Sequence, residues 1–227
     1  MQKNFYHENK ESSPEYLNTY IQDIEDKIIN TPLSPFHICL DLEFTNSPTS
    51  IKDTLINYIK THKLKTLFVM INGFSANPQN EFYYELSGSV NEWERDFDFA
   101  NADVMTYDEF KLTGMDEIAT LFEVYNEARV YKFTYSKYSE QRQQSRLEKI
   151  QKWFPNHMTI FEEFCQDKNG FYFNNSNIIS SVVTNLINAK FFRLLKYSIE
   201  QINNQTIPII ANDFDNCETP IEFYPKQ

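Results

Sequence analysis

Two pairs of carboxylates have the spacing of a candidate metal site. Asp41 and Glu43 end an apolar run over residues 36–44, whose alternating second half predicts a strand. Because strand side chains alternate with a period of two, both carboxylates would lie on one face. Asp213 and Asp215 follow the last predicted strand with the same spacing. Carboxylates gathered in this way hold divalent metals for phosphodiester cleavage, so one hypothesis is a metal-dependent phosphodiesterase or nuclease.

The segment Leu-Asp-Leu-Glu-Phe-Thr at residues 40–45 resembles the first motif of the DEDD exonucleases. In that family such carboxylates hold the catalytic metal ions, so the resemblance implies that Asp41 and Glu43 are metal ligands. It covers only this short motif. The family also places a His or Tyr shortly before its last Asp, and residues 203–211 contain neither. The second pair of carboxylates therefore departs from the family's pattern.

The other nucleophilic and metal-binding residue types are scattered. The cysteines Cys39, Cys165 and Cys217 form no Cys-x-x-Cys pair, and the four histidines are widely spaced. Cys39 lies in an apolar run and is predicted to be a small core residue. A catalytic dyad of a histidine with Cys39 or Cys165 stays open as an alternative. The four glycines are too far apart for a phosphate-cradling loop, which excludes nucleotide sites of the Walker and dinucleotide types.

The charge of the chain is uneven. The formal net charge of -11 attracts basic partners and repels nucleic acid and anionic membranes. Within residues 81–127 only Arg95 and Lys111 oppose a dense run of acids. Trp93 lies where the acids are densest, and an aromatic ring among carboxylates is typical of a contact with a basic protein. The predicted partner-binding residues are Glu92, Trp93, Glu94, Asp96, Asp98, Asp103, Asp108 and Glu109.

Two alternatives to this binding surface stay open. The acidity can serve solubility alone, and Trp93 can turn inward from a half-exposed strand over residues 93–99. The sign of the charge reverses in the next part of the chain, where a polar predicted helix over residues 139–154 carries Arg142 and Arg146. These arginines could contact phosphate or pair with the acidic stretch of the same molecule. Trp153, near the end of that helix, is expected to anchor it to the core.

Hydrophobic periodicity predicts a mixture of helices and strands. The predicted helices are residues 14–30, 47–63, 116–127, 139–154, 154–165 and 178–202. The predicted strands are residues 36–44, 67–71, 82–86, 93–99, 131–135 and 207–211. The first two strands and the helix between them permit a parallel crossover, and Pro208 favours a sheet edge for the last strand. The predicted fold class is α+β, with a mixed sheet of about five strands packed with several helices in a single compact domain.

The chain is expected to consist of a short tail and one domain. Residues 1–13 are predicted to be a polar N-terminal tail, and residues 14–227 a single α+β domain. Within that domain, residues 81–127 form the acidic middle and residues 139–203 the helix-rich C-terminal half. No apolar leader or bilayer-length apolar run is visible, so a cytoplasmic location with reduced thiols is expected.

In size, acidity, abundance of Asn and Phe, and mixed architecture, the chain is similar to immunity proteins of bacterial toxin–immunity systems. The resemblance implies a non-enzymatic cytoplasmic inhibitor without a cofactor, which blocks a cognate basic toxin by offering carboxylates to its active site. Its partner would be a protein rather than nucleic acid or a membrane. The alternatives are the metal-dependent phosphodiesterase described above and a structural subunit of a larger complex, which would expose a large apolar patch.

Overall fold

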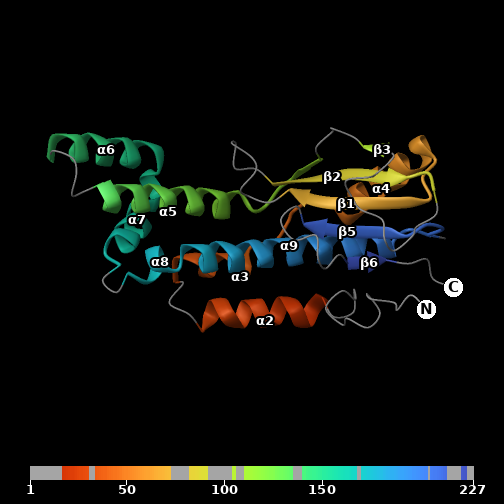
Figure 1. Cartoon of the computed structure of the whole chain (residues 1–227), viewed down its shortest axis with the longest axis horizontal. Helices are drawn as coiled ribbons and strands as arrows, with labels where there is room; N and C mark the ends of the chain where they lie inside the picture. The colour runs from red at the N-terminus through yellow and green to blue at the C-terminus, as the bar shows by residue number, and fades with distance from the viewer. Residues whose placement is uncertain are drawn as a thin grey trace.

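A computed structural model (Figure 1) describes residues 17–30, 34–72, 82–91, 104–105, 110–134, 140–167, 170–203, 205–213 and 221–223. A β-sheet and its covering helices occupy one end of the elongated molecule, and a group of helices occupies the other. The long helix α9 (Ser176–Glu200) runs from one end to the other. The predicted α+β class with a mixed sheet is confirmed, and the sheet is open.

Helices make up most of the described residues. In chain order they are α2 (Leu17–Ile29), the 3-10 turn η2 (Ser34–His37), α3 (Ile38–Asp41), α4 (Pro48–His62), α5 (Asp116–Thr134), α6 (Glu140–Trp153), the 3-10 turn η4 (Pro155–His157), α7 (Met158–Cys165), α8 (Phe171–Asn174) and α9. Within the described residues, no helix combines the length and the apolar character needed to cross a bilayer.

The strands of the described residues form one sheet. They are β1 (Thr66–Asn72), β2 (Phe82–Ser89), β3 (Val104–Met105), β4 (Phe110–Leu112), β5 (Ile209–Asp213) and β6 (Ile221–Phe223). The order is β3-β2-β1-β5-β6, and β4 also pairs with β2. Only β1 and β5 are parallel, and the other pairs are antiparallel. β1, β2 and β5 form the body of the sheet, and the short strands β3, β4 and β6 extend it.

An unbroken apolar run forms β1, the central strand of the sheet. Leu67, Phe68 and Val69 in β1 are all fully buried, so both faces of this strand are covered, as its unbroken apolar sequence predicts. The Leu67 backbone N–H donates to the carbonyl oxygen of Pro208 at 3.0 Å, just before β5. The prediction that Pro208 marks an edge strand is wrong, because β5 lies between β1 and β6. The proline precedes the strand, where it interrupts no ladder hydrogen bond.

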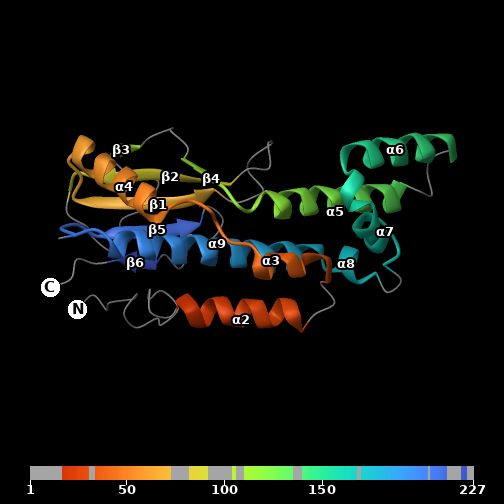
Figure 2. The same cartoon turned by 180° about the vertical axis from the view of Figure 1, so that it is seen from behind.

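Helices α4 and α9 lie side by side against one face of the sheet (Figure 2). α4 begins with Pro48 at its first position, which suits the fixed backbone angle of proline, and it ends at Lys63 in the left-handed conformation. Ile51 and Leu55 from its predicted inner stripe are buried. Helix α2 packs along α9 on the side away from the sheet (Figure 1).

Helices α5 to α8 project away from the sheet and are called the helical arm below (Figure 1). Aromatic rings fill its interior. Phe164 of α7 packs on Phe36 at a centroid distance of 5.7 Å, on Tyr125 at 5.2 Å and on Tyr172 at 5.1 Å. The hydroxyl of Tyr125 donates to the carbonyl oxygen of Tyr172 at 2.7 Å, which satisfies a buried polar group. These contacts join the arm to the turn η2.

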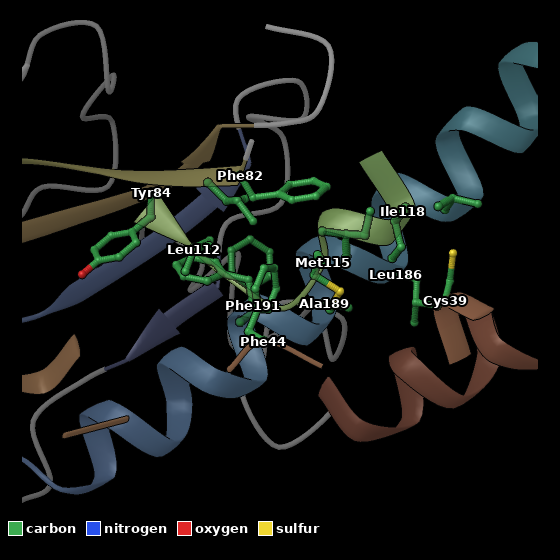
Figure 3. Close-up of a cluster of buried hydrophobic side chains, with 14 of the residues drawn as sticks. Cys39, Phe44, Phe82, Tyr84, Leu112, Met115, Ile118, Leu186, Ala189 and Phe191 are labelled. Carbon is green, nitrogen blue, oxygen red and sulfur yellow. The ribbon is translucent and has the colours of Figure 1, made fainter. Parts of the chain in front are cut away.

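A second aromatic group connects the sheet to the arm (Figure 3). Phe191 of α9 packs on Phe44 at 6.2 Å and on Tyr84 of β2 at 5.7 Å, and Phe44 packs on Phe82 at 6.3 Å. Met115, at the start of α5, lies in the same cluster. The buried apolar residues of both ends therefore form one continuous core.

The predicted strand over residues 36–44 is wrong, because its first part is helical. Pro35 is the second residue of the 3-10 turn η2, and α3 continues this turn to Asp41. Phe36 and Cys39 are buried three residues apart, whereas Ile38 between them is 38% exposed, so the burial follows a helical period. Without this strand, the predicted parallel crossover is absent; the one parallel pair of the described sheet joins β1 to the distant β5.

The predicted strand over residues 131–135 is also wrong, since α5 continues through Thr134. Two contacts hold this last part of the helix in place. The ring of Tyr131 packs on Phe161 at 5.6 Å, and Lys132 donates to the carbonyl oxygen of Asp167 at 2.8 Å. Tertiary packing here overrides the β-propensity of the Tyr-Lys-Phe-Thr-Tyr sequence.

Candidate functional site

The densest part of the acidic stretch is attached to one edge of the sheet. The eight predicted partner-binding residues, Glu92, Trp93, Glu94, Asp96, Asp98, Asp103, Asp108 and Glu109, lie outside the described residues. Both flanks are described: β2 ends at Ser89, and β3 begins at Val104. Since Val104 pairs with Gly88, the chain departs from the end of β2 and returns beside that same end. The acids of residues 92–103 are therefore tethered at both ends to a single point on the sheet.

This point of attachment is tightly packed. A Cβ atom added to Gly88 would lie 2.5 Å from a side-chain carbon of Leu64 and 2.6 Å from the carbonyl oxygen of Thr66, so only glycine fits there. The Ser89 carbonyl accepts a hydrogen bond from the Lys65 backbone N–H at 2.9 Å, and the Ser89 hydroxyl accepts one from the Asn91 N–H at 3.0 Å. The base of the acidic segment is thereby fixed against the start of β1.

The charge of the chain resides in the acidic middle. Residues 81–127 contain thirteen acids and two bases, which gives this part of the chain the same net charge, -11, as the whole. The remaining residues contain nineteen acids and nineteen bases, so they are neutral overall. The excess negative charge is a local property rather than a general feature of the surface.

Two acids of this stretch that lie on α5 contact other parts of the helical arm. Glu127 accepts a hydrogen bond from Arg146 Nη2 at 2.8 Å, and Glu117 lies 2.5 Å from His157 Nε2. Burial, with a smaller contribution from the charge of Glu127, raises the pKa of Glu123 above its ordinary value. The predicted pairing of the basic helix with the acidic stretch of the same molecule is confirmed for Arg146.

The expectation that Trp153 anchors α6 to the core is wrong, because Trp153 is 59% exposed. The residue that holds this helix is Ile150, one turn earlier, which is fully buried. Leu147, which is partly buried, packs against the same core. A polar helix fourteen residues long is therefore attached by a narrow apolar contact.

Asp41 and Glu43, the predicted metal ligands, do not lie on the strand that was expected to align them. Asp41 is the last residue of α3, and Glu43 follows in extended chain. The Glu43 carboxylate accepts a hydrogen bond from Arg193 Nη2 at 2.5 Å and lies 3.4 Å from Lys190 Nζ, so two cations already occupy it. Asp213 is the last residue of β5, and Asp215 lies outside the described residues. Across the described ranges, no three His, Cys, Asp or Glu side chains are gathered to hold a metal ion.

Lys190 is a residue that the sequence pattern did not single out. Its side chain is fully buried, and its ammonium donates to the carbonyl oxygens of Cys39 at 2.8 Å, Leu40 at 2.9 Å and Leu42 at 2.6 Å. These carbonyls belong to the C-terminal end of α3, where a cation is favourable. The sequence offered one sign of this role, a lysine among the apolar residues in the middle of α9. A buried ammonium needs acceptors for its donors, so such a lysine indicates a contact with polar groups.

The two described cysteines are poor nucleophiles. Burial raises the pKa of the Cys39 thiol to about 12, although the nearby Lys190 charge opposes this shift. Burial likewise raises the pKa of Cys165 to about 11. Because the thiolate is the reactive form, both residues remain unreactive thiols near neutral pH. The prediction that Cys39 is a buried core residue is confirmed.

Comparison of this chain with protein-family models, with curated proteins and with solved structures finds no match. The function must therefore be argued from the charges, contacts and attachment points of the chain itself.

Proposed function

We propose that this chain is a non-enzymatic binding protein, an immunity-type inhibitor that acts in the cytoplasm on a cognate basic toxin. The observation that carries the proposal is the location of the charge. All of the excess negative charge lies in residues 81–127, and its densest segment is tethered at both ends to the adjacent strands β2 and β3. A concentrated patch of one sign attracts a partner of the opposite sign from a distance and suppresses wrong partners.

The described groups with catalytic potential support a binding role, because they are engaged in internal contacts. Glu43 is paired with two cations, Lys190 is enclosed by three carbonyl oxygens, and Cys39 is a buried thiol. The phosphodiesterase alternative loses its geometric support with the missing strand at residues 36–44. No described contact favours it, so the binding role is the only function proposed.

The tethered base suits the acidic segment to inhibition. A binding segment whose two ends are fixed loses less conformational freedom on binding than a free tail of the same length. The sheet body supplies that fixed base through the close packing of Gly88 on Leu64 and Thr66. The acids can then be offered to a basic cleft as a group, rather than one at a time.

The test compares two variants with the same net charge. In the stretch variant, four acids at the predicted interface are reversed: Glu92→Lys, Glu94→Lys, Asp96→Lys and Asp98→Lys. In the control variant, four acids outside residues 81–127 are reversed: Asp23→Lys, Glu25→Lys, Asp53→Lys and Glu162→Lys. Each set of reversals changes the net charge from -11 to -3, so a difference between the two variants reports position rather than total charge.

Wild type and both variants are used to capture partners from the lysate and secreted fraction of the source cell, at low and then moderate salt. The affinity of any stoichiometric basic protein is then measured by calorimetry. We expect the stretch variant to bind roughly a hundredfold more weakly than wild type and the control variant to bind nearly as tightly. Equal losses in the two variants, or capture of no basic protein at either salt concentration, would reject the proposed function.

A further inference from the structure

A pocket of about 390 Å³ lies on the helical arm, away from the acidic sheet edge. Figure 1 shows α6 running along α5 at the end of the molecule farthest from the sheet. Six of the residues that line this pocket, called the α6 pocket below, come from α6 and one from α5. They are Arg142, Ser145, Arg146, Lys149, Ile150 and Trp153, with Glu127 from α5.

The α6 pocket is positively charged within an acidic protein. Arg142, Arg146 and Lys149 stand against the single carboxylate of Glu127. The three cations and Trp153 follow one another at intervals of four, three and four residues, which places them on one side of α6. Positions with this spacing are usually apolar where one helix packs on another. Here three of the four positions carry a positive charge, so this side of the helix is suited to an anion.

One cation of the α6 pocket has an unsatisfied donor. Arg146 Nη2 donates to Glu127 at 2.8 Å, and this contact holds the guanidinium group in position. Its Nε atom is buried and has no hydrogen-bond partner among the described residues. A buried donor without a partner costs free energy, and the flat guanidinium group is well shaped for phosphate oxygens. Lys149, less than one turn further along α6, is exposed and can bring its ammonium to the same anion.

Trp153 supplies an aromatic surface at the end of the pocket. It is 59% exposed and stands one turn after Lys149, on a helix that is otherwise polar. Planar bases stack on tryptophan rings in single-stranded nucleic-acid sites, with a gain of about 1–3 kcal/mol per base. A ligand that combines an anion with a planar ring would use the cations of the α6 pocket and the exposed ring together.

We propose that the α6 pocket binds a phosphate ester of a planar aromatic group, of which a nucleoside monophosphate is the simplest form. The phosphate lies against the exposed part of the Arg146 side chain and accepts hydrogen bonds from the Lys149 ammonium and the Ser145 hydroxyl, and the base stacks on Trp153. Glu127 positions Arg146. The phosphate is held by side chains, so the site needs no glycine-rich loop. Apart from Glu127, the residues that line this site lie outside the acidic stretch, and the inference does not depend on the proposed function.

The first measurement is the fluorescence of Trp153 in the full chain. The chain contains two tryptophans, so Trp93→Phe leaves Trp153 as the reporter. Adenosine monophosphate, adenosine and inorganic phosphate are titrated separately at low salt. Adenosine monophosphate is expected to quench Trp153 and to bind at least about tenfold more tightly than either fragment, because it uses both halves of the site.

Two lysines of α6 provide a matched pair of variants. Lys149→Gln removes a cation of the α6 pocket, whereas Lys152→Gln removes an exposed cation of the same helix that does not line it. By calorimetry, Lys149→Gln is expected to weaken binding of adenosine monophosphate roughly tenfold, and Lys152→Gln less than about twofold. Trp153→Leu should abolish the preference for adenosine monophosphate over inorganic phosphate. Circular dichroism is used to check that each variant keeps its helices.

Three results would overturn the proposal. The first is no detectable binding of adenosine monophosphate at millimolar concentration. The second is an equal loss of affinity in Lys149→Gln and Lys152→Gln, which indicates attraction to general positive charge. The third is inorganic phosphate binding as tightly as adenosine monophosphate, which removes the aromatic part of the ligand. An acidic peptide of glutamates that competes as well as adenosine monophosphate would also reject a nucleotide site.

Discussion

At the sheet end of the molecule, Phe191 packs on Phe44 and Tyr84, and in the helical arm Phe164 packs on Phe36 and Tyr125. The two interiors are built alike, from aromatic rings that belong to one core. Their surfaces differ. The sheet edge holds both ends of the densest acidic segment, and the far end of the arm holds a pocket with three cations.

The two ends also use their cations differently. Near the sheet, Lys190 and Arg193 of α9 contact α3 and the Glu43 carboxylate, where they stabilise the fold. On α6, Arg146 is fixed by one carboxylate yet keeps an unsatisfied Nε donor, and Lys149 is exposed. A net charge of -11 thus conceals a basic site and an acidic site on one molecule. Substitutions at each end can test how independent the two ends are.

The largest effects are expected from removing the central ring of each aromatic group. Phe191→Ala at the sheet end and Phe164→Ala in the arm should each lower the free energy of unfolding by about 3–5 kcal/mol, since both rings are fully buried. Because the core is continuous, unfolding in urea should show one transition by circular dichroism and by Trp153 fluorescence. If Phe164→Ala made the fluorescence change at lower urea than the circular dichroism, the arm would unfold separately and the single core would be wrong.

A smaller loss is expected from removing the buried cation. Lys190→Met should lower the free energy of unfolding by about 3 kcal/mol, because it leaves three carbonyl oxygens at the end of α3 without their donor. Lys196→Met, on the same helix but partly exposed, is the control and should cost less than about 1 kcal/mol. Urea titrations measure both. Similar losses in the two variants would show that the carbonyl contacts of Lys190 contribute little.

Alkaline pH should destabilise the protein through its buried thiols. The pKa of Cys39 is raised from 9.0 to about 12, so above pH 9 the unfolded thiol loses its proton while the folded one keeps it. Stability therefore falls as pH rises, by about 1.4 kcal/mol from Cys39 at pH 10. Cys39→Ala should flatten the fall measured between pH 8 and pH 10. Cys165→Ala in the arm should flatten it by nearly as much, because a folded pKa of about 11 also lies above this range of pH. An unchanged fall in either variant would contradict this assignment.

The fold could be predicted from the sequence where the apolar pattern was strong. The amphipathic spacing in α2 and α4, the unbroken apolar run of β1 and the long apolar face of α9 each identified an element. The prediction failed where tertiary contacts decide. Residues 36–41 are helical because Pro35 lies in the turn η2 and Lys190, distant in the sequence, binds the carbonyl oxygens at the end of α3. β6 is three residues long and leaves too little pattern to detect.

The candidate sites, like the fold, could be predicted from the sequence only in part. The pairing of Arg146 with Glu127 could be predicted from the charge pattern, because a basic helix follows an acidic stretch in the sequence. The acidic binding surface stays a prediction, since its eight residues lie outside the described ones. The sequence left a phosphate contact of Arg142 and Arg146 open, but the α6 pocket itself depends on how α6 lies on α5 and on the exposure of Trp153. The carboxylate pair at Asp41 and Glu43 is not aligned as a strand would align it, because a helix forms there instead.

Growth rescue is the most direct test of the proposed inhibition. The basic partner obtained by capture is expressed alone and with the wild-type chain, the stretch variant or the control variant. The partner alone should arrest growth, and the wild type and the control variant should restore it. The stretch variant should fail, although it carries the same net charge as the control. Full rescue by the stretch variant, at equal protein levels, would contradict the claim that residues 81–127 neutralise a basic toxin.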